Sequence, residues 1–475
     1  MINGLLNKTV AVFGLGRTGM AVVRELKQRG VHIIAWDAKE ELRREAMALG
    51  AAAQDLMTLD FSSVELLVIS PGIAHTHPAP HPVAEAAKKA GVKIVSDIEL
   101  FVSTYREAKY IGITGTNGKS TTTALIHHIL KSNGVPAEIG GNFGIPVFDL
   151  PRMAGDGYYV LELSSYQLEL TPSLDLDIAV LLNITPDHLS RHNGMEGYIA
   201  AKKLVFRRAR KKNATNVVAV DDENTRKIFR ELSKDSPAGV KNISVSYERK
   251  AEGGYYANAK GILFDNTGAE AREILDLRQL DGLKGKHNRQ NVAAAFAACR
   301  SAGIAQTKIA AALKSFRTLD HRMQTIGKFA GVTFINDSKA TNAESVKHAL
   351  DSMDDIYWIL GGRPKEGGID ILRPQLARGN IKRAFAIGEC EKQFYAATKK
   401  DIPSYRCGRL DKAVMKAFKY ALKDMKKGKA AAPAILLSPA TASFDQYKSF
   451  EERGEHFARI FEDIKKKYRD KFGDA

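Results

Sequence analysis

The stretch YIGITGTNGKSTTTA, residues 110–124, most narrowly limits what this chain can fold into. An apolar segment runs into a glycine-rich turn and then into a helix-forming segment, which is the order of a phosphate-binding loop in a parallel α/β domain. A strict phosphate loop needs glycine at position 113, but Ile113 stands there and the glycines are at 112 and 115. The stretch is therefore either a phosphate loop with variant spacing or a coincidence.

The turn itself has two interpretations. Successive backbone N–H groups and the dipole of the following helix would form an anion cradle, with Lys119 reaching the terminal phosphates and Ser120 offering a hydroxyl to Mg²⁺. The alternative is a glycine turn with a surface lysine. We favour the cradle, because the Gly-Lys-Ser sequence lies in the strand–loop–helix context that a cradle requires.

Apolar strand-like segments alternate with helix-like segments along the chain, as in TVAVF, TGMAVVRELKQRG and HIIAWD near the start. This rhythm predicts parallel sheets with flanking helices, an α/β fold. A chain of 475 residues is too long for one ordinary domain. We predict three domains, each on a mainly parallel sheet: a Rossmann-like domain over 1–98, a phosphate-loop domain over 99–318 and a Rossmann-like domain over 319–475. Residues 241–280 alternate like antiparallel hairpins and predict a lid or an edge insertion.

The segment GLGRTG follows the first predicted strand and opens a helix, and Asp37 ends the next strand. Together they match the dinucleotide fingerprint. The glycines could instead serve a tight strand–helix turn, or the turn could hold another phosphate or nucleotide at the helix N-terminus. The motif alone does not separate these interpretations, and it favours a nucleotide-type ligand more than NAD.

Three residues after the phosphate loop are candidates for a magnesium–phosphate site. Glu162 lies inside an apolar strand, where a buried carboxylate must be paired or coordinated but an outward-facing one needs no partner. His188 follows Asp187 at the end of another strand, and a single loop histidine is more often solvated. Lys202 resembles an ordinary helix lysine, since nothing in its spacing or in the composition marks it.

Two polar loops stand out in the last third of the chain. NDSKATN, residues 336–342, brings Asp337, Lys339 and Thr341 into one strand–helix junction, and SPATASFDQYKSFEERG, residues 438–454, has the same strand–turn–helix order. Asp, Ser, Thr and Asn are also common helix caps, which is the alternative interpretation. The lysine in the first loop favours an anion or phosphate nearby.

The net charge of +17 could indicate a nucleic-acid partner. No nucleic-acid module accompanies it, so we favour solvated lysines, as in 423–429 and 465–471, together with a site for an anionic small molecule. The sequence predicts no membrane span and no signal peptide. Three widely separated cysteines, Cys299, Cys390 and Cys407, fit a reducing cytosol.

Taken together, these loops resemble the Mur ligase family, the ATP-dependent amide-forming enzymes of peptidoglycan precursor synthesis. The resemblance covers essentially the whole chain. The motifs that carry it are GLGRTG, SPGIA, GTNGKST, ELSSYQLE, NITPDHLSRH, KGKHNRQN, HRMQ, NDSKATN and SPATASFDQYKSFEERG. The family's phosphate loop has the spacing of GTNGKST, which accounts for the glycine that the strict pattern misplaces.

The first motifs, GLGRTG and SPGIA, and the last, NDSKATN and SPATASFDQYKSFEERG, point to the family member that adds D-glutamate. The resemblance therefore implies a ligase that joins D-glutamate to UDP-N-acetylmuramoyl-L-alanine through an acyl phosphate. It implies ATP and two Mg²⁺ sites but no NAD, so GLGRTG becomes a site for the UDP-linked substrate. It also implies a cytoplasmic enzyme that serves cell shape and cell division, and we expect a monomer without a nucleic-acid partner.

The resemblance also assigns roles to individual residues. Lys119, Glu162, His188 and Lys202 would be catalytic. Ser120 and Glu162 would hold one Mg²⁺, and His188 would help to hold a second, together with Lys202, which is carbamylated in this family. The positions implied for ATP are Gly115, Thr116, Asn117, Gly118, Lys119, Ser120, Thr121, Asn288, Asn291, Arg322, Asp337 and Lys339. Those implied for the UDP-linked substrate are Arg17, Thr18, Asp37, Gly72, Asn142 and Ser164. Those implied for D-glutamate are Thr341, Lys365, Ser443 and Phe450.

Other functions compete with this one. Within the enzyme class, the chain could be a Mur-type ligase for another amino acid or a folylpolyglutamate-type ligase, although GLGRTG and NDSKATN speak against both. From a different class, it could be a nucleotide-binding regulatory protein that uses NAD through GLGRTG. A basic nucleic-acid-binding module is the third alternative, and it would bind any duplex in a salt-sensitive manner.

Overall fold

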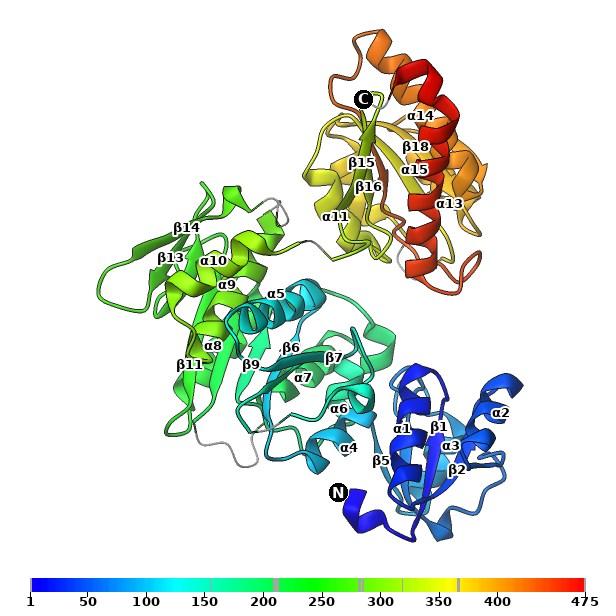
Figure 1. Ribbon diagram of the computed structural model, residues 1–475, viewed down its shortest axis with the longest axis vertical. Coiled ribbons are helices and arrows are strands. Elements are labelled where there is room, and N and C mark those ends of the chain that lie inside the picture. Colours follow the sequence, from blue (N-terminus) through cyan, green and yellow to red (C-terminus); the bar gives the residue numbers. More distant parts are fainter. Residues whose placement is uncertain are drawn as a thin grey trace. The chain divides into compact units, whose positions relative to one another are not determined.

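The computed structural model describes residues 2–153, 155–207, 213–280, 283, 286–317, 319–364 and 368–473. The chain forms two compact units, Met1–Phe316 and Arg317–Ala475, whose elements are drawn in Figure 1. Two sheets belong to the first unit and a third sheet to the second unit. The predicted α/β fold with mainly parallel sheets is confirmed. The division of the chain at residues 98 and 318 stays a prediction.

The first sheet is five-stranded and parallel, in the order β3-β2-β1-β4-β5. Apolar side chains project from both faces of this sheet, because helices cover both faces. Its strands are β1 (Thr9–Phe13), β2 (His32–Trp36), β3 (Ala52–Ala53), β4 (Val64–Ile69) and β5 (Lys93–Val95), and its helices are α1 (Arg17–Gln28), α2 (Glu40–Ala48), α3 (Pro82–Lys89) and α4 (Asp97–Thr104). The strand order reverses between β1 and β4, so the glycine turn after β1 lies where such sheets bind ligands.

The second sheet has nine strands in the order β14-β13-β12-β11-β10-β9-β6-β8-β7. Its strands are β6 (Lys109–Thr114), β7 (Ala137–Gly141), β8 (Tyr158–Glu162), β9 (Ile178–Leu181), β10 (Thr215–Ala219), β11 (Lys241–Ser246), β12 (Gly254–Ala257), β13 (Ile262–Asn266) and β14 (Arg272–Asp276). Its helices are α5 (Lys119–Ser132), α6 (Ser165–Glu169), α7 (Met195–Lys203), α8 (Glu223–Lys234), α9 (Lys286–Ser301) and α10 (Gln306–Ser315), with the 3-10 helix η4 (Leu189–His192). Because β9, β6 and β8 are parallel neighbours, the loops after them meet at one edge.

The prediction of antiparallel hairpins over 241–280 is right for only part of that segment. β12, β13 and β14 are antiparallel and extend one edge of the second sheet. β11 instead pairs in parallel with both β10 and β12. It follows helix α8, and a strand that returns through a helix pairs in parallel with the strand before that helix. The residues of β11 pass from exposed and half-buried at its start to buried at its end.

The second unit holds a six-stranded sheet in the order β15-β16-β20-β17-β18-β19, in which only β15 and β16 pair antiparallel. The strands are β15 (Gln324–Phe329), β16 (Val332–Asn336), β17 (Ile356–Gly361), β18 (Ile381–Ile387), β19 (Ser404–Gly408) and β20 (Ala434–Leu437). The helices are α11 (Ala343–Asp351), α12 (Arg373–Leu376), α13 (Glu391–Thr398), α14 (Leu410–Lys426) and α15 (Phe450–Phe472). Helices on both faces explain why the central strands are apolar throughout.

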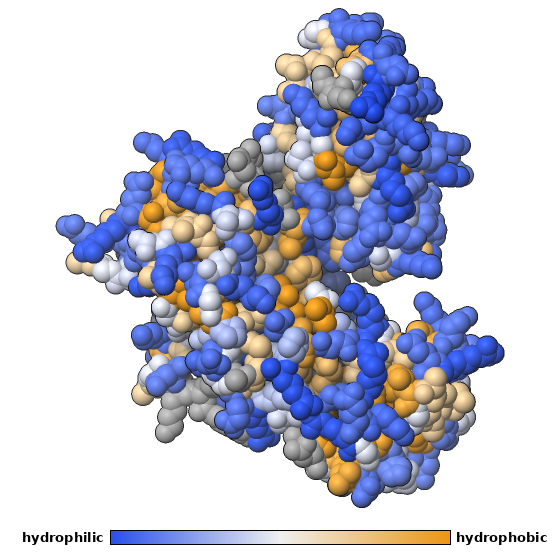
Figure 2. Space-filling model, viewed as in Figure 1, coloured by the Kyte–Doolittle hydropathy of each residue, from blue (hydrophilic) through white to orange (hydrophobic). Residues whose placement is uncertain are grey.

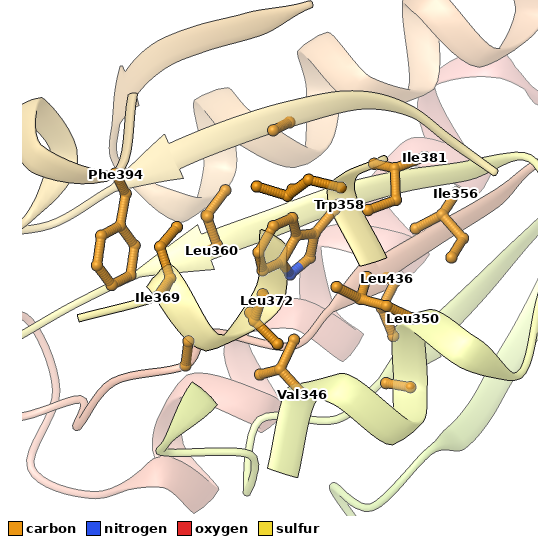
Figure 3. Packing of buried hydrophobic residues seen from close by; sticks show 14 of the residues in the cluster. Val346, Leu350, Ile356, Trp358, Leu360, Ile369, Leu372, Ile381, Phe394 and Leu436 are labelled. Carbon is orange, nitrogen blue, oxygen red and sulfur yellow. The ribbon is translucent and has the colours of Figure 1, made fainter. Parts of the chain in front are cut away.

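Trp358 on β17 anchors one apolar layer of the second unit. Its indole packs among Leu360, Leu372 and their neighbours in Figure 3, and all of these side chains are buried. The indole N–H donates to the carbonyl oxygen of Ser438 at 2.8 Å. Tyr357, the preceding residue, belongs to the opposite layer with α14 and α15. Successive strand residues thus serve two layers. Among the helices that the structure describes, none is long and apolar enough to cross a bilayer.

Candidate active site

The turn between β6 and α5 has the geometry of an anion cradle. Gly118 precedes the helix with a φ of 85°, in the left-handed region that glycine tolerates best. A Cβ at this position would also overlap Oδ1 of Asn291, so both the backbone angle and the available space favour glycine. A phosphate would use the N–H groups at the start of α5 as donors.

Lys119, the first residue of α5, folds back over this turn. Its Nζ donates to the carbonyl oxygens of Gly115 at 2.8 Å and Thr116 at 2.7 Å. The ammonium group therefore sits at the mouth of the turn, next to the N–H groups of the helix. A positive charge and backbone donors that converge on one place form a site for an anion.

Glu162 ends β8 and is almost fully buried, which answers the question that the sequence left open. Its Oε2 accepts a short hydrogen bond from the hydroxyl of Ser120, and its Oε1 accepts one from Nδ2 of Asn142 at 2.6 Å. The carboxylate therefore points toward the phosphate turn rather than outward. Asn142, which stays a predicted residue of the UDP-linked substrate site, contacts this carboxylate.

Lys202 on α7 is buried, with 1% of its surface exposed. Its Nζ donates to the carbonyl oxygen of Gly115 at 2.8 Å and lies 4.6 Å from the ring centre of Tyr198. Burial, and then the charge of Lys119, hold the pKa of this amine well below its usual value, while Asp187 and Glu162 act in the opposite direction. Beside the phosphate turn, the surroundings of this amine thus disfavour its protonated form.

His188 lies at the end of the loop after β9, just before η4. Its φ is 53°, its ring is 5.2 Å from that of Tyr166, and its Nε2 is 3.6 Å from Oδ2 of Asp187. Within the described ranges, no three His, Cys, Asp or Glu side chains gather closely enough to hold a metal ion. A cation near His188 would therefore need ligands beyond those residue types.

The helix α9 supplies the next layer of the site. Asn291 accepts from the hydroxyl of Thr122 at 3.3 Å and donates to Oδ1 of Asn288 at 3.0 Å. Both predicted asparagines therefore lie against α5. Sequence reasoning missed Asn183, whose Oδ1 accepts from the N–H of Asn117 at 2.8 Å. A polar residue that ends the buried strand segment DIAVLLN could have marked it.

The first sheet carries the GLGRTG turn and the residues predicted around it. Asp37 accepts from the N–H of Leu15 at 2.8 Å, so it stabilises the turn directly. A Cβ on Gly19 would overlap the carbonyl oxygen of Gly14, which supports the interpretation as a tight strand–helix turn. Arg17 is exposed and donates to the carbonyl oxygen of Gly144 at 3.4 Å.

Three further residues are predicted to bind the UDP-linked substrate: Thr18, Gly72 and Ser164. Thr18 is half-buried in the GLGRTG turn, and Gly72 is exposed in the loop after β4. Ser164 caps α6, because its hydroxyl oxygen accepts from the N–H of Gln167 at 3.3 Å. Ser164 therefore serves as the N-cap of α6.

In the second unit, Asp337 follows β16 and is buried. Its carboxylate accepts from the hydroxyl of Ser438 at 2.7 Å and from the N–H of Met323 at 3.2 Å. Burial raises the pKa of Asp337 to about 7, although these donors and the charge of Arg322 act against the rise. The group therefore titrates near neutral pH.

Lys339 lies close to Asp337 in the same loop. Its Nζ is 4.0 Å from the ring centre of Phe450, the first residue of α15. Ser443 and Thr341 belong to neighbouring loops, and Ser443 is buried. Lys365, also predicted for D-glutamate, lies outside the described residues. Asn342 caps α11 through the N–H of Ser345 at 2.8 Å, so one residue of NDSKATN serves as a helix cap.

Arg453 on α15 is a second residue that sequence reasoning missed. It is 1% exposed and donates to the backbone oxygen of Ser338 at 2.8 Å and to that of Thr441 at 3.3 Å. Burial lowers the pKa of this guanidinium to about 10. Arg453 thereby joins the two polar loops of the second unit, and an arginine on the apolar face of a helical pattern could have marked it.

Comparison with known families finds two matches. Residues 113–299 match the family model described as Mur ligase middle domain. Residues 8–96 match the one described as Mur ligase MurD-like, N-terminal domain. The two matches contain the phosphate turn, Glu162 and Lys202, as well as the GLGRTG turn.

Curated relatives match the chain over nearly its full length. A protein of Paramagnetospirillum magneticum named "UDP-N-acetylmuramoylalanine--D-glutamate ligase" is 45% identical over 456 residues, 96% of each chain. A protein of Rhodospirillum rubrum with the same name is 45% identical over 460 residues, 96% of this chain and 94% of its own. Such similarity over whole chains shows a common family.

Solved structures are similar at the level of the fold. UDP-N-acetylmuramate-alanine ligase MurC from Thermotoga maritima has a TM-score of 0.59 at 18% identity, over 96% of this chain and 99% of its own. MurF from Acinetobacter baumannii has a TM-score of 0.58 at 17% identity, over 95% of this chain and 93% of its own.

Proposed function

The chain belongs to the Mur ligase family, and we propose that it joins D-glutamate to UDP-N-acetylmuramoyl-L-alanine while ATP is converted to ADP and phosphate. As a Mur ligase it is an ATP-dependent ligase of peptidoglycan synthesis. The observation that carries the choice of substrates is the 45% identity to curated D-glutamate ligases over 96% of the chain. The match of residues 8–96 to the MurD-like N-terminal domain supports the same branch.

The reaction has two steps. The L-alanyl carboxylate attacks the γ-phosphorus of ATP, so that an acyl phosphate forms and ADP leaves. The amine of D-glutamate then attacks the acyl carbon, and phosphate leaves as the amide bond forms. Lys119 and the N–H groups of the turn after β6 would offset the charge that develops on the transferred phosphoryl group. Asn288, Asn291 and Asn117 would position the nucleotide around that turn.

Ser120 and Glu162 fit a magnesium ion, because they place a hydroxyl and a buried carboxylate side by side at the phosphate turn. Oxygen ligands of this kind are the ones that Mg²⁺ prefers. When bound, the ion would neutralise phosphate charge. Asn142 would keep the carboxylate of Glu162 oriented through its own hydrogen bond.

The surroundings of Lys202 support carbamylation. Carbamylation joins the neutral amine to carbon dioxide through a new N–C bond and releases one proton. A lowered pKa favours the neutral form of the amine, which is the form that reacts, and the nearby charge of Lys119 would attract the anionic product. The carbamate would add oxygen ligands next to His188, where the described His, Cys, Asp and Glu side chains are too few to hold an ion.

The remaining assignments follow the same proposal. The residues that would lie along the UDP-linked substrate are Arg17, Thr18, Asp37, Gly72, Asn142 and Ser164. Thr341, Ser443 and Phe450 of the second unit would bind D-glutamate, and Asp337, Lys339 and Arg322 would contact the nucleotide. The domains would span 1–98, 99–318 and 319–475, in a cytoplasmic monomer.

Phosphate release from ATP with UDP-N-acetylmuramoyl-L-alanine tests the proposal directly. We expect release with D-glutamate and background rates with L-alanine, diamino acids and L-glutamate. Release with one of the other amino acids alone would overturn the choice of D-glutamate, and glutamate addition to a folate would favour the folylpolyglutamate alternative. A titration with NADH fluorescence is the companion experiment, since tight binding would favour the regulatory alternative.

A further inference from the structure

We infer that Arg191, His192 and Glu169 are positioning residues that hold the 70–77 loop of the first sheet against the segment 188–202, which carries His188 and Lys202. The 70–77 loop follows β4 and contains Gly72. The attachment of the loop stands on the contacts alone, whereas its consequence for catalysis rests on the proposed function.

Arg191 makes the most direct connection. Its Nη1 donates to the carbonyl oxygen of His77 at 2.7 Å, and its Nη2 donates to that of Ile73 at 3.3 Å. The guanidinium carbon lies 4.8 Å from the ring centre of Tyr166, which fixes the plane of the fork. One side chain of η4 therefore binds the 70–77 loop at two of its backbone carbonyls.

His192, the next residue, continues this connection in the buried interior. Its Nδ1 is 3.2 Å from Oε1 of Glu169, and its Nε2 is 2.9 Å from Oγ of Ser165. Since a carboxylate only accepts, Nδ1 carries the proton that it shares with Glu169. The imidazole also stacks on Tyr166, with ring centres 5.3 Å apart. Both ends of the ring are thus held by α6.

Glu169, at the other end of this series of contacts, lies close to the 70–77 loop as well. Oε2 of Glu169 lies 3.8 Å from Nε2 of His75, just beyond hydrogen-bond distance. This oxygen and Nδ1 of His75 are buried atoms without a hydrogen-bond partner among the described residues. Unsatisfied buried polar atoms are costly, so a small shift of the loop that brings Nε2 of His75 within hydrogen-bond distance would satisfy Oε2 of Glu169.

The backbone of η4 packs closely against α7, which carries Lys202. His188 and Asn193 flank η4 with φ values of 53° and 54°, which are uncommon for residues other than glycine. A Cβ on Gly197 would overlap the carbonyl oxygen of His192, so η4 and α7 are in close backbone contact. The position of Lys202 on α7 is thereby tied to that of Arg191 and His192.

The consequence concerns the two ends of one substrate. Under the proposed function, the loop with Gly72 lies at the uridine diphosphate end, and His188 and Lys202 lie at the reacting carboxyl. A fixed attachment between them sets the distance that the substrate must span. Loss of the attachment would weaken the binding of that substrate more than the binding of ATP, because Arg191 contacts the 70–77 loop directly and is linked to the phosphate turn indirectly, through Lys202.

Hydrogen exchange on the ligand-free protein tests the attachment without any assumption about function. The variant is Arg191→Lys, which keeps the charge but loses the two-pronged contact. The matched control is Arg24→Lys, because Arg24 on α1 also joins the first sheet to the second, through Asp149 at 2.8 Å, but away from the 70–77 loop. We expect exchange of the 70–77 amides to rise several-fold in Arg191→Lys and to stay at the wild-type rate in Arg24→Lys. Unchanged exchange in Arg191→Lys would overturn the inference.

Steady-state kinetics test the catalytic consequence. We expect the KM for UDP-N-acetylmuramoyl-L-alanine to rise about tenfold in Arg191→Lys, as for the loss of one charge-assisted hydrogen bond, while the KM for ATP stays unchanged. Glu169→Gln should act in the same direction, and it covers the case in which Arg191→Lys fails to fold. A faster-exchanging loop with unchanged KM would overturn the positioning role. A wild-type protein without turnover would contradict the proposed function, and hydrogen exchange would still decide the attachment.

Discussion

At the scale of single residues, the burial of Lys202 determines what it can do. A charged lysine in this position would be desolvated beside Lys119, whereas a neutral amine donates to Gly115 without that cost. We predict that Lys202→Ala lowers ligase turnover about 100-fold or more, as for loss of a metal-site group. Formate or acetate should restore part of the activity by replacing the carbamate oxygens. Turnover of ATP in carbonate-buffered solution, with and without these anions, measures both effects.

The control for this prediction is the adjacent lysine. Lys203 on the same helix is exposed and pairs with Glu231 at 2.6 Å. Lys203→Ala should therefore keep normal turnover and show no response to formate. A Lys202→Ala protein that is fully active and indifferent to carbon dioxide would exclude the carbamate role.

Lys119 carries a separate prediction. Its ammonium group lies over the phosphate turn, held by two carbonyl oxygens that a bound phosphate would replace as partners. We expect Lys119→Ala to lower ADP formation about 1,000-fold, since it removes a charge aimed at the transferred phosphoryl group. Its thermal unfolding should stay close to that of the wild type. Lys131→Ala, at the exposed end of the same helix, is the matched control. Near-normal ADP formation in Lys119→Ala would contradict the role of the turn.

Asp337 makes the stability of the second unit depend on pH. Its pKa is about 7 in the folded chain against an ordinary value of 3.8, so the folded state keeps a proton that the unfolded state has released. The free energy of unfolding should therefore fall as pH rises from about 4 to about 7, by up to about 4 kcal/mol. Asp337→Asn should remove this fall.

Trp358 is a suitable reporter for that measurement, because its indole N–H and the carboxylate of Asp337 both bind Ser438. The chain contains two tryptophans, so Trp36→Phe isolates the signal. We would follow urea unfolding by fluorescence at pH 5 and pH 7.5 in this background, with and without Asp337→Asn. Equal pH dependence in the two proteins would show that Asp337 does not titrate in this range.

Some of these residues could be predicted from the sequence and others could not. Lys119 and Asp337 lie in polar turns after apolar strands, and such turns are visible in a single sequence. Lys202 has no local mark, and only a resemblance to a family singled it out. His192 and Arg453 owe their importance to contacts with residues far away in the chain, which no spacing rule encodes.

At the scale of secondary-structure elements, the two glycines that flank helix α5 can be compared, because both have a positive φ. Gly118 precedes it and Gly134 follows it, with φ values of 85° and 74°. Alanine should cost about 1 kcal/mol of stability at either position, because both are left-handed. Only Gly118→Ala would also overlap Asn291, since a Cβ on Gly134 meets no atom within 4 Å. We expect Gly118→Ala alone to lose ATP binding in calorimetric titrations, and equal affinity in the two variants would contradict the cradle.

The elements themselves were largely predictable. Apolar segments that end in glycine or polar turns predicted the strands, because a strand buried on both faces must be apolar throughout. The direction of β11 was not predictable from its own residues, since its alternating pattern fits either pairing. The crossover through α8 decides the direction, and crossovers belong to the order of elements rather than to one segment.

At the scale of the whole molecule, the sequence predicted the class of fold and the number of sheets, but not the order of strands within them. The order places the turns after β6, β8 and β9 together, and this is why Glu162 meets Ser120 although they are 42 residues apart. Adjacency of this kind depends on how the strands assemble. The prediction that much of the lysine excess is solvated is confirmed for Lys423, Lys426 and Lys427, which are exposed at the C-terminal end of α14.

The surface supports the prediction that the protein is a monomer. In the ranges that the structure describes, the exposed large apolar side chains come from separate segments: Leu6, Met47, Met57, Ile145, Leu189, Ile371 and Phe444. Apolar residues that are scattered singly are normal on the surface of a monomer. On the face shown in Figure 2, hydrophilic residues cover most of the second unit, and the net charge of +17 makes like copies repel one another.

Sedimentation equilibrium therefore should give a mass of 52.1 kDa, that of one chain. The repulsion between copies weakens as salt screens it, so the decisive measurement is at high ionic strength. A monomer that persists there would not owe its state to charge repulsion between copies. A mass that doubles with added salt would show that an interface exists and that charge alone had hidden it, and the monomer assignment would then be wrong.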